Sequence, residues 1–258
     1  MSRAVAPTSF PGFVAESPAM REVLELTLRL ASARSAVLLQ GESGTGKDLV
    51  AHWLHYGGTR REGPFITIHC PSIPADLLES ELFGYEKGAF TGAGKLELGD
   101  GGTIYLDQVQ DLPATLQAKL LRVVEEHQFE RLGGTRTVEV DLRFLAASNS
   151  SLSIEVAAGR FREDLFHRLN VVPLRLPPLR ERREDVSALS RLFLGRERAR
   201  GATVADGFEG EAEERLLAYD WPGNVRELRS AVEAAALADR SGLISARALP
   251  AAIVSHGG

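Results

Sequence analysis

The segment Gly41–Asp48 has the spacing of a phosphate-binding loop. Gly41 and Gly46 lie five positions apart and Lys47 follows directly, which matches the pattern G-x-x-x-x-G-K. In such loops the glycines let backbone N–H groups close around phosphate oxygens, and the lysine reaches the terminal phosphates. The flanking apolar segments predict a strand before the loop and a helix after it, and the positive dipole end of that helix faces the same anion. We therefore expect a triphosphate to bind Gly41, Glu42, Ser43, Gly44, Thr45, Gly46, Lys47 and Asp48.

Polar side chains at two predicted strand ends complete the candidate site. Asp107 ends the apolar run 103–106, and Asn149 follows the apolar run 142–148. Because the carboxyl ends of parallel strands share one edge of a sheet, both residues lie where ligands bind. Asp107 is suited to organise Mg²⁺ beside the loop, whereas Asn149 taken alone is explained equally well as a turn former. Asp48 stands where a Ser or Thr hydroxyl usually meets Mg²⁺.

Four residues of the region are of types that bind zinc, namely His52, His55, His69 and Cys70. Their spacings match no metal-binding pattern, and phosphate-loop chemistry explains the region better, so we do not expect a zinc site. Cys70 is the only cysteine. An internal disulfide is therefore excluded, and a reducing compartment is indicated.

The composition is that of an ordinary globular protein, with 44% apolar and 25% charged residues. The formal net charge of -5 disfavours a surface built to hold nucleic acid. Apolar stretches stay short of the ~18 residues of a membrane span, and the N-terminus lacks the core of a signal peptide. These features predict a cytoplasmic protein without membrane or DNA binding.

The hydrophobic pattern predicts an α/β fold followed by a helical region. Strands are expected at 36–40, 65–69, 103–107, 142–148 and 171–176. Helices are expected at 20–30, 49–56, 74–83 and 112–128, and after residue 180 at 186–198, 209–219, 225–238 and 246–254.

Two segments between these elements have distinctive compositions. Residues 84–94 are rich in glycine and are predicted to hold no regular element. The charged run Arg180–Asp185 is predicted to be a solvated hinge. We place the domain boundary there, with an α/β domain at 1–180 and a helical domain at 181–258.

Several motifs together resemble the AAA+ central domain of the sigma-54-dependent transcriptional activators. They are GESGTGKD (41–48), GYEKGAFTGA (84–93), GGTIYLDQ (101–108), FREDLFHRLNVVPLRLPPLRERREDV (161–186) and WPGNVREL (221–228). The resemblance spans nearly the whole chain, and GAFTGA is its most specific part. It implies an AAA+ P-loop NTPase with a mainly parallel five-stranded sheet and an α-helical lid. It also implies rings, usually hexamers, that bind ATP and Mg²⁺ between subunits.

The resemblance assigns roles to individual positions. Asp107 corresponds to the Walker B acid, Asn149 to sensor I and Arg226 to sensor II of the lid. Arg162 and Arg168 correspond to the arginines that reach the ATP of the neighbouring subunit, although surface ion pairing with Glu163 or Asp164 also explains them. The loop that engages sigma-54 and remodels the RNA polymerase complex corresponds to Gly88, Ala89, Phe90, Thr91, Gly92 and Ala93.

Three departures from the family pattern bear on activity. Gln108 replaces the Walker B glutamate, His69 replaces the asparagine that holds this glutamate, and only Gly94–Lys95 precedes Leu96 after GAFTGA, which shortens the loop segment. Losing a general base typically costs on the order of 10²–10⁴ in rate. In one hypothesis the chain therefore binds ATP and hydrolyses it slowly, since a Gln can still orient water; in the other, His69 is a substitute base.

Three rival functions remain open at this stage. The chain could be a general AAA+ remodelling subunit, although the intact GAFTGA sequence argues against that. It could be a regulatory ATP-binding module without remodelling activity. A DNA-binding regulator would need a helix-turn-helix unit, which we do not find after the lid.

Overall fold

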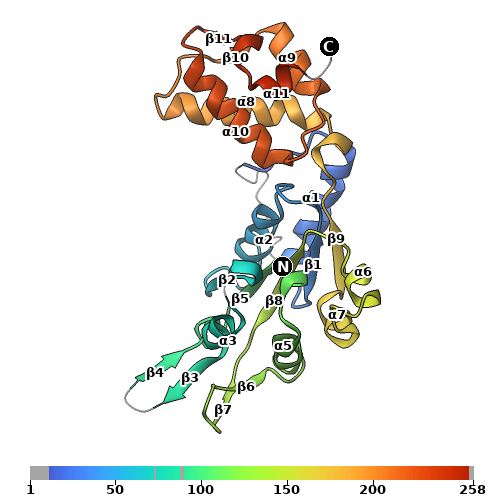
Figure 1. Ribbon diagram of the computed structural model, residues 1–258, viewed down its shortest axis with the longest axis vertical. Coiled ribbons are helices and arrows are strands. Elements are labelled where there is room, and N and C mark those ends of the chain that lie inside the picture. Colours follow the sequence, from blue (N-terminus) through green and yellow to red (C-terminus); the bar gives the residue numbers. More distant parts are fainter. Residues whose placement is uncertain (1–11, 73, 88–89, 256–258) are drawn as a thin grey trace, which may run out of the picture. The chain divides into compact units, whose positions relative to one another are not determined.

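The computed structural model describes residues 12–72, 74–87 and 90–255, which form two compact units. The sheet unit consists of residues 26–41 and 47–175. The lid unit consists of the described residues up to 25, residues 42–46, and those from 176 onward. Figure 1 labels most helices and strands of both units.

The sheet unit is built on five strands in the order β2-β5-β8-β1-β9. All four neighbouring pairs are parallel. The strands are β1 (Val37–Gln40), β2 (Phe65–His69), β5 (Thr103–Asp107), β8 (Arg143–Ser148) and β9 (Val172–Arg175). Each corresponds to one predicted apolar segment, so the prediction of a parallel five-stranded sheet is confirmed. The central strands β1, β5 and β8 are almost completely buried, as expected where helices and loops cover both faces of a parallel sheet, whereas the edge strands β2 and β9 are partly exposed.

Helices of the sheet unit pack around one apolar core, which includes Leu38, Ile68, Leu106 and Leu120. The helices of this unit are α2 (Lys47–Tyr56), α3 (Ala75–Phe83), α4 (Lys95–Leu98), α5 (Ala114–Glu126), α6 (Leu152–Ala157) and α7 (Glu163–Leu169), and helix α1 (Pro18–Ala31) belongs to it from residue 26 on. Helix α5 is shorter than predicted. Pro113 precedes its first turn, and His127 ends it with a left-handed backbone at φ 55°.

The glycine-rich segment was predicted to hold no regular element, and this is wrong. Strands β3 (Gly84–Lys87) and β4 (Phe90–Ala93) pair as an antiparallel hairpin. A backbone ladder does not require large side chains, and Gly84 turns into the hairpin with φ 69° and ψ −177°, a conformation that is essentially restricted to glycine. Residues 88 and 89, which include two of the predicted contact positions, lie outside the described residues.

A second hairpin, which the sequence did not predict, joins β6 (Gln128–Glu130) to β7 (Thr137–Glu139). The loop between these strands bonds to the first hairpin. Glu86 N donates to the carbonyl oxygen of Leu132 at 2.9 Å, and Leu132 N donates to that of Gly84 at 3.0 Å. The two hairpins lie side by side in Figure 1. The two hairpins are therefore joined by backbone hydrogen bonds.

A buried arginine ties the ends of two helices to the sheet. Arg143 of β8 donates to the carbonyl oxygens of Leu30 at 2.7 Å, Ala31 at 2.8 Å and Leu54 at 2.9 Å. These carbonyls lie in the last turns of α1 and α2, whose dipoles favour a cation there. Burial lowers the pKa of Arg143 to about 10.

The lid unit is mainly helical, as predicted. It contains α8 (Glu184–Ala199), α9 (Gly210–Ala218), α10 (Asn224–Ala238) and α11 (Ala251–Val254), with a short parallel pair of strands, β10 (Gly207–Phe208) and β11 (Leu243–Ile244). Trp221, Leu228 and Val232 are completely buried in its core. The single helix predicted at 246–254 is wrong. Ala246–Ala248 form a 3₁₀ turn, Leu249 is extended, and α11 begins directly after Pro250. The residue before a proline is disfavoured in a helix, which separates the two segments.

The charged run Arg180–Asp185 is not the solvated hinge that was predicted. Arg182 is 2% exposed and Asp185 is completely buried, although Arg180 and Arg183 are exposed. Charged side chains are buried only when they are paired or hydrogen-bonded, and both residues have such partners.

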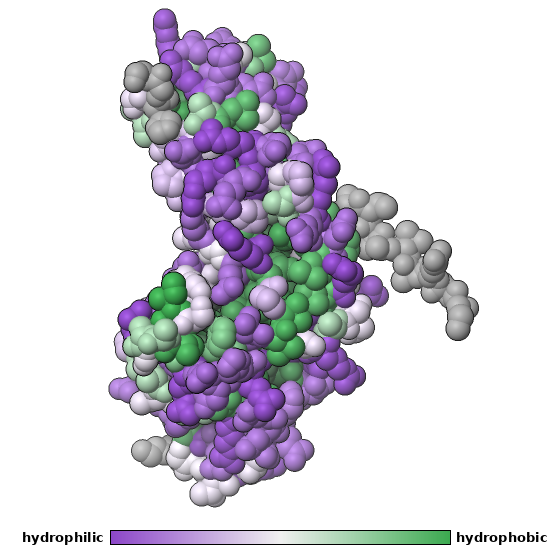
Figure 2. Space-filling view, turned by 90° about the vertical axis from the view of Figure 1, so that its right-hand side faces the viewer, coloured by the Kyte–Doolittle hydropathy of each residue, from purple (hydrophilic) through white to green (hydrophobic). Residues whose placement is uncertain are grey.

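In the part of the chain that the structure describes, no helix has the length and apolar character needed to cross a membrane. Figure 2 looks onto the side where Figure 1 draws α6, α7 and β9, and hydrophobic patches interrupt a mainly hydrophilic surface.

Candidate functional site

Lys47 and Asn149 are brought together in the sheet unit. Lys47 is the first residue of α2, and its Nζ donates to the carbonyl oxygen of Gly41 at 2.6 Å and to Oδ1 of Asn149 at 2.7 Å. Gly41 follows β1 and Asn149 follows β8, which are neighbours in the sheet. The ammonium group is thus held at the carboxyl ends of two parallel strands, the edge where such sheets bind ligands.

Asp107 and His69 form a second pair at the same edge of the sheet. They end β5 and β2 and lie opposite each other in the register. Nδ1 of His69 is 3.0 Å from Oδ2 of Asp107. The Asp107 side chain is 13% exposed and the His69 side chain 56% exposed. The carboxylate therefore fixes one nitrogen of the imidazole ring and leaves the other face of the ring open to solvent.

Gln108 adopts a left-handed backbone conformation, with φ 56° and ψ 51°. A non-glycine residue in this region is uncommon, and Asn, Asp and His are the residues that favour it. The conformation turns the chain sharply after Asp107 into the 3₁₀ turn Val109–Asp111. One further contact of this turn was not predicted, since the backbone N–H of Asn149 donates to Oε1 of Gln110 at 3.4 Å.

Asp48 has a partner that the sequence did not predict. The hydroxyl of Tyr105, which is 1% exposed, donates to Oδ1 of Asp48 at 2.8 Å. Burial raises the pKa of Tyr105, and the Asp48 carboxylate raises it further. Tyr105 therefore remains a donor, and it orients the carboxylate that occupies the position of the usual Mg²⁺-binding hydroxyl.

Residues 42–46 of the loop are held within the lid unit. The carbonyl oxygen of Gly44 accepts from Val225 N at 3.0 Å, and Ser43 Oγ accepts from the Arg226 guanidinium at 2.8 Å. Gly44 has φ 78°, and a Cβ there would lie 2.3 Å from the carbonyl oxygen of Gly223. Only glycine fits this position. Arg226, the predicted sensor II residue, thus contacts the loop directly.

Glu42 and Asn224 complete the set of contacts around the loop. Arg180 binds the Glu42 carboxylate through two hydrogen bonds, of 2.6 and 2.9 Å. The buried Asn224 donates from Nδ2 to Glu42 Oε2 at 3.1 Å and to the carbonyl oxygen of Ser43 at 3.0 Å. Neither Arg180 nor Asn224 was predicted as a site residue. The sequence signal that could have identified Asn224 is an asparagine directly after Pro222 and Gly223, because Asn tolerates a left-handed backbone, and Asn224 has φ 54°.

Arg162 and Arg168 are exposed and lie at helix α7. Arg162 binds Asp164 through two hydrogen bonds, of 2.7 and 3.0 Å, and Arg168 binds Glu125 at 2.6 Å. Their side chains are 48% and 60% exposed. Within the described ranges, their partners are these surface carboxylates rather than the groups around Lys47 or Asp107.

The hairpin presents part of the predicted contact loop. In the β3–β4 register, Phe90 lies opposite Lys87 and Thr91 opposite Glu86. Gly92 and Ala93 return the chain to the base, where Ala93 lies opposite Gly84.

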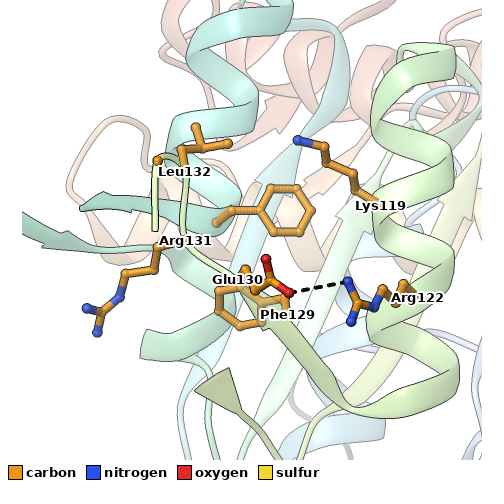
Figure 3. Close-up of a pocket in the computed structure, with 8 residues that line it drawn as sticks. Lys119, Arg122, Phe129, Glu130, Arg131 and Leu132 are labelled. Carbon is orange, nitrogen blue, oxygen red and sulfur yellow. Dashed lines mark ion pairs between the residues drawn. The ribbon is translucent and has the colours of Figure 1, made fainter. Parts of the chain in front are cut away.

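A cavity of about 220 Å³ lies beside the β6 end of these hairpins. Figure 3 shows Lys119 and Arg122 on one side and the segment Phe129–Leu132 on the other. Its cations already have acidic partners: Lys119 bonds to Glu79, Arg122 to Glu126 and Arg131 to Glu97. We therefore do not assign it a ligand. The cavity is lined by Phe83, Lys119, Arg122, Phe129, Glu130, Arg131, Leu132 and Gly133.

The residues present fit Mg²⁺ and a phosphate group better than zinc. Across the residues that the structure describes, no three His, Cys, Asp or Glu side chains are grouped as metal ligands. His55 is instead bonded to Thr103, and burial raises the pKa of Cys70 to about 12, so it is a thiol and not a thiolate ligand. Mg²⁺ prefers one or two carboxylates, water and phosphate oxygens, which Asp107 and Asp48 beside a phosphate loop would provide.

A parallel sheet with a loop-borne lysine at its carboxyl edge defines an α/β protein of the P-loop class. The chain belongs to the sigma-54 interaction domain family, whose model matches residues 13–175. A second model, described as an AAA+ ATPase lid domain, matches residues 180–257.

Relatives and solved structures agree with this membership. The transcriptional regulatory protein ZraR of Klebsiella oxytoca is 47% identical over 247 residues, which cover 94% of this chain and 56% of that protein. The Nif-specific regulatory protein of Azospirillum brasilense is 46% identical over 96% of this chain and 41% of that protein. The crystal structure of NtrX from Brucella abortus in complex with ATP matches with a TM-score of 0.87 and 40% identity over 93% of this chain and 55% of that one. The chain thus spans about half the length of these relatives.

Proposed function

We propose that this chain is the ATP-binding AAA+ module of a transcriptional activator, and that it engages sigma-54 RNA polymerase through the GAFTGA hairpin. The observation that carries the proposal is the position of Lys47, held by Gly41 and Asn149 at the end of the phosphate loop. Family membership and the ATP-bound NtrX structure support the same assignment. We keep the proposed boundary, with the nucleotide-binding domain at 1–180 and the lid at 181–258.

The residues of the site have separate tasks in this proposal. The Lys47 ammonium leaves its present partners to bind terminal phosphate oxygens, and the loop amides bind the rest of the anion. Arg226, which already contacts Ser43 of the loop, is proposed to take part in binding the anion. Asp107 and Asp48 would hold Mg²⁺, which supplies charge neutralisation on the phosphate oxygens when bound.

The same proposal connects the site to the hairpin through the chain itself. His69, bonded to Asp107, is followed by the 3₁₀ turn Cys70–Ser72, by α3 and then by β3. Helix α3 contacts both α4 and β3. We propose that a change at Asp107 on nucleotide binding or hydrolysis is passed to the hairpin through α3. We propose that Phe90 and Thr91 in β4 are the contacts to sigma-54.

Hydrolysis is proposed to be slow because Gln108 cannot accept a proton from the attacking water. The geometry of His69 favours one alternative. Its Nδ1 is engaged by Asp107, so in the neutral ring with a proton on Nδ1, Nε2 is the acceptor. An imidazole oriented by a carboxylate in this way is a general base in other enzymes. Weak hydrolysis and hydrolysis through His69 are thus the two forms of the proposal.

Steady-state ATP turnover of substituted chains separates the two forms. If Gln108 limits the rate, Gln108→Glu raises turnover by about 10²-fold or more, the usual contribution of a general base, and His69→Ala changes it little. If His69 is the base, His69→Ala abolishes turnover and Gln108→Glu gives no gain. His127→Asn is the control, at an exposed histidine that ends α5 with a left-handed backbone that Asn tolerates, and it should leave turnover unchanged.

Contact with sigma-54 is tested by binding. We expect Thr91→Ala to reduce capture of purified sigma-54 by at least about tenfold while affinity for ADP stays unchanged. Thr137→Ala, at an exposed threonine on the neighbouring β7, is the control and should retain capture. Equal capture by the two variants would contradict the proposed hairpin contact and favour a regulatory ATP-binding module. Remodelling of other proteins without sigma-54 would indicate a general AAA+ ATPase.

A ring, which we propose to be a hexamer, accounts for the surface at α6 and α7. Ile154 is 63% exposed and Val171 is 55% exposed, next to the exposed Arg162 and Arg168. Apolar side chains around arginines are typical of protein interfaces. In a ring, these arginines would exchange their surface carboxylates for the γ-phosphate of the neighbouring subunit. We also propose a cytoplasmic location, because RNA polymerase is there, and no DNA binding by this chain.

A further inference from the structure

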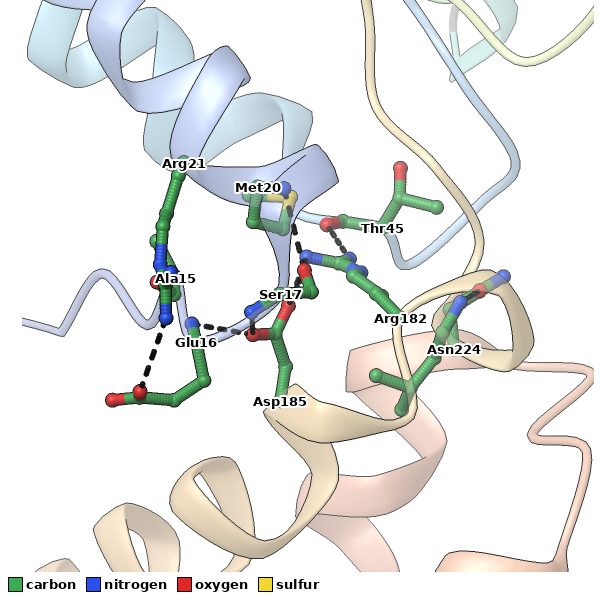
Figure 4. A network of polar contacts seen from close by, with 10 residues as sticks. Ala15, Glu16, Ser17, Met20, Arg21, Thr45, Arg182, Asp185 and Asn224 are labelled. Carbon is green, nitrogen blue, oxygen red and sulfur yellow. Dashed lines mark hydrogen bonds and ion pairs between the residues drawn. The ribbon is translucent and has the colours of Figure 1, made fainter.

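A buried carboxylate in the lid unit has no task in the proposed function. Asp185, in the first turn of α8, is completely buried. Its Oδ1 accepts from Glu16 N at 2.7 Å and from Ser17 N at 2.8 Å, and its Oδ2 accepts from Ser17 Oγ at 3.0 Å. Figure 4 shows these bonds converging on the carboxylate. Asp185 therefore fixes the backbone directly before α1.

Arg182 connects this carboxylate to the phosphate loop. One guanidinium nitrogen is 3.9 Å from Asp185 Oδ2, and the other donates to the carbonyl oxygen of Thr45 at 2.7 Å. Figure 4 shows the guanidinium between Thr45 and Ser17. Thr45 is itself 2% exposed, and its hydroxyl donates to the carbonyl oxygen of Glu42 at 2.8 Å. The chain of contacts thus runs from within the loop to the start of α1.

Burying Arg182 and Asp185 costs desolvation free energy. Burial lowers the pKa of Arg182, although Asp185 opposes the shift. Nε of Arg182 is buried and has no hydrogen-bond partner among the residues that the structure describes. Apolar residues of similar volume often stabilise a fold as well as or better than a buried ion pair. What the polar groups add is a directional link to one particular backbone carbonyl.

We propose that Arg182 and Asp185 transmit the state of the phosphate loop to the segment that enters α1. The inference rests on the proposed binding of nucleotide at residues 41–48. A phosphate group that orders the loop amides also fixes the carbonyl of Thr45, which fixes Arg182 and, through Asp185, the amides of Glu16 and Ser17. Coupling between sites is reciprocal. A partner that binds residues 12–17 therefore changes the affinity for nucleotide by the same factor as nucleotide changes the affinity for that partner.

The amides of Glu16 and Ser17 report on this coupling directly, because each is hydrogen-bonded to Asp185. We expect saturating ADP to slow their hydrogen exchange, measured by NMR on the whole chain, by at least about fivefold, the lower end of typical coupling. In Arg182→Met the effect of ADP should vanish, although ADP still binds. Arg183→Met, at the adjacent exposed arginine that bonds to Asp220, is the control and should retain the effect.

The outcomes distinguish this inference from the proposed function. A parallel titration with fluorescent ADP measures binding. If ADP does not bind the parent chain, both fail. If ADP binds but exchange at Glu16 and Ser17 does not slow, or slows equally in Arg182→Met, only the coupling is wrong and the contact is structural. If Arg182→Met fails to fold, Arg182→Lys is used instead. It keeps a positive charge beside Asp185 but lacks the second guanidinium nitrogen that bonds to the Thr45 carbonyl oxygen, so ADP should no longer slow exchange at Glu16 and Ser17.

Discussion

At the scale of single residues, the protonation of His55 affects the stability of the fold. It is 1% exposed, its Nδ1 is 2.9 Å from Thr103 Oγ1, and burial lowers its pKa below the ordinary 6.5, with the positive charge of Arg143 adding to the shift. The neutral ring is therefore favoured in the native state. As pH falls through about 6.5, the unfolded chain binds the proton first, so stability falls until the lower native pKa is passed.

This predicts a smaller free energy of unfolding at pH 5.5 than at pH 7.5, measured by urea denaturation. His55→Asn, whose amide can keep the bond to Thr103, should flatten the pH dependence between these values even if it lowers stability overall. His167→Asn, at a histidine whose side chain is 66% exposed, should leave the slope as it is in the parent chain. An unchanged slope in His55→Asn would assign the pH dependence to other groups.

The sequence predicted the positions of site residues better than their partners. Lys47, Asp107 and Asn149 were expected at one sheet edge because each adjoins a predicted parallel strand, and the structure brings Lys47 and Asn149 into contact. The bond from Tyr105 to Asp48 could not be predicted, because it depends on how α2 packs beside β5. Spacing along a chain identifies a motif, but it does not specify contacts between residues 57 positions apart.

At the scale of elements, strands with strong apolar patterns were predicted and irregular ones were not. The β3–β4 hairpin was missed because its glycine-rich sequence has a single β-branched residue, Thr91, while its strands are held by backbone pairing and by backbone bonds to Leu132. The run Arg180–Asp185 was misjudged for a related reason. Burial of Arg182 and Asp185 depends on partners at Thr45 and Ser17, which are distant in sequence.

Gly84 is the element-scale position to test. Gly84→Ala places a Cβ 2.3 Å from the carbonyl oxygen of Gly92, in a backbone conformation whose strain is about 1–3 kcal/mol for other residues. We expect the hairpin to shift and sigma-54 capture to fall by about tenfold or more, with ADP affinity retained. Gly101→Ala has a similar φ of 74° but no neighbour within 4 Å, so it controls for strain alone. Equal loss in both variants would show that the hairpin base is not specifically required.

At the scale of the whole molecule, the fold class followed from the sequence because the pattern is strong and simple. Five apolar strands alternating with helices leave few topologies, and the parallel order β2-β5-β8-β1-β9 is the result. The arrangement of subunits is a different problem, since it depends on surfaces rather than on buried periodicity. Arg162 and Arg168, bonded to carboxylates of their own chain, are the residues through which assembly would act.

Assembly predicts that ATP turnover per chain rises with protein concentration. An arginine supplied by a neighbour contributes about 10³–10⁵ in rate in related phosphoryl transfers, so Arg168→Ala should remove the concentration dependence together with most of the activity. Arg191→Ala, at an exposed arginine of the lid unit paired with Glu213, should retain both. Turnover that is independent of concentration in the parent chain would contradict catalysis between subunits.

The bonds between Ser17 and Asp185 also limit how the chain can be shortened. A protein cut to begin at Pro18 would retain the whole of α1 and every motif of the family, yet Asp185 would lose its bonds to Glu16 and Ser17. A buried carboxylate deprived of such donors typically costs a few kcal/mol. A chain cut at the first residue of α1 would therefore be less stable than one cut a few residues earlier.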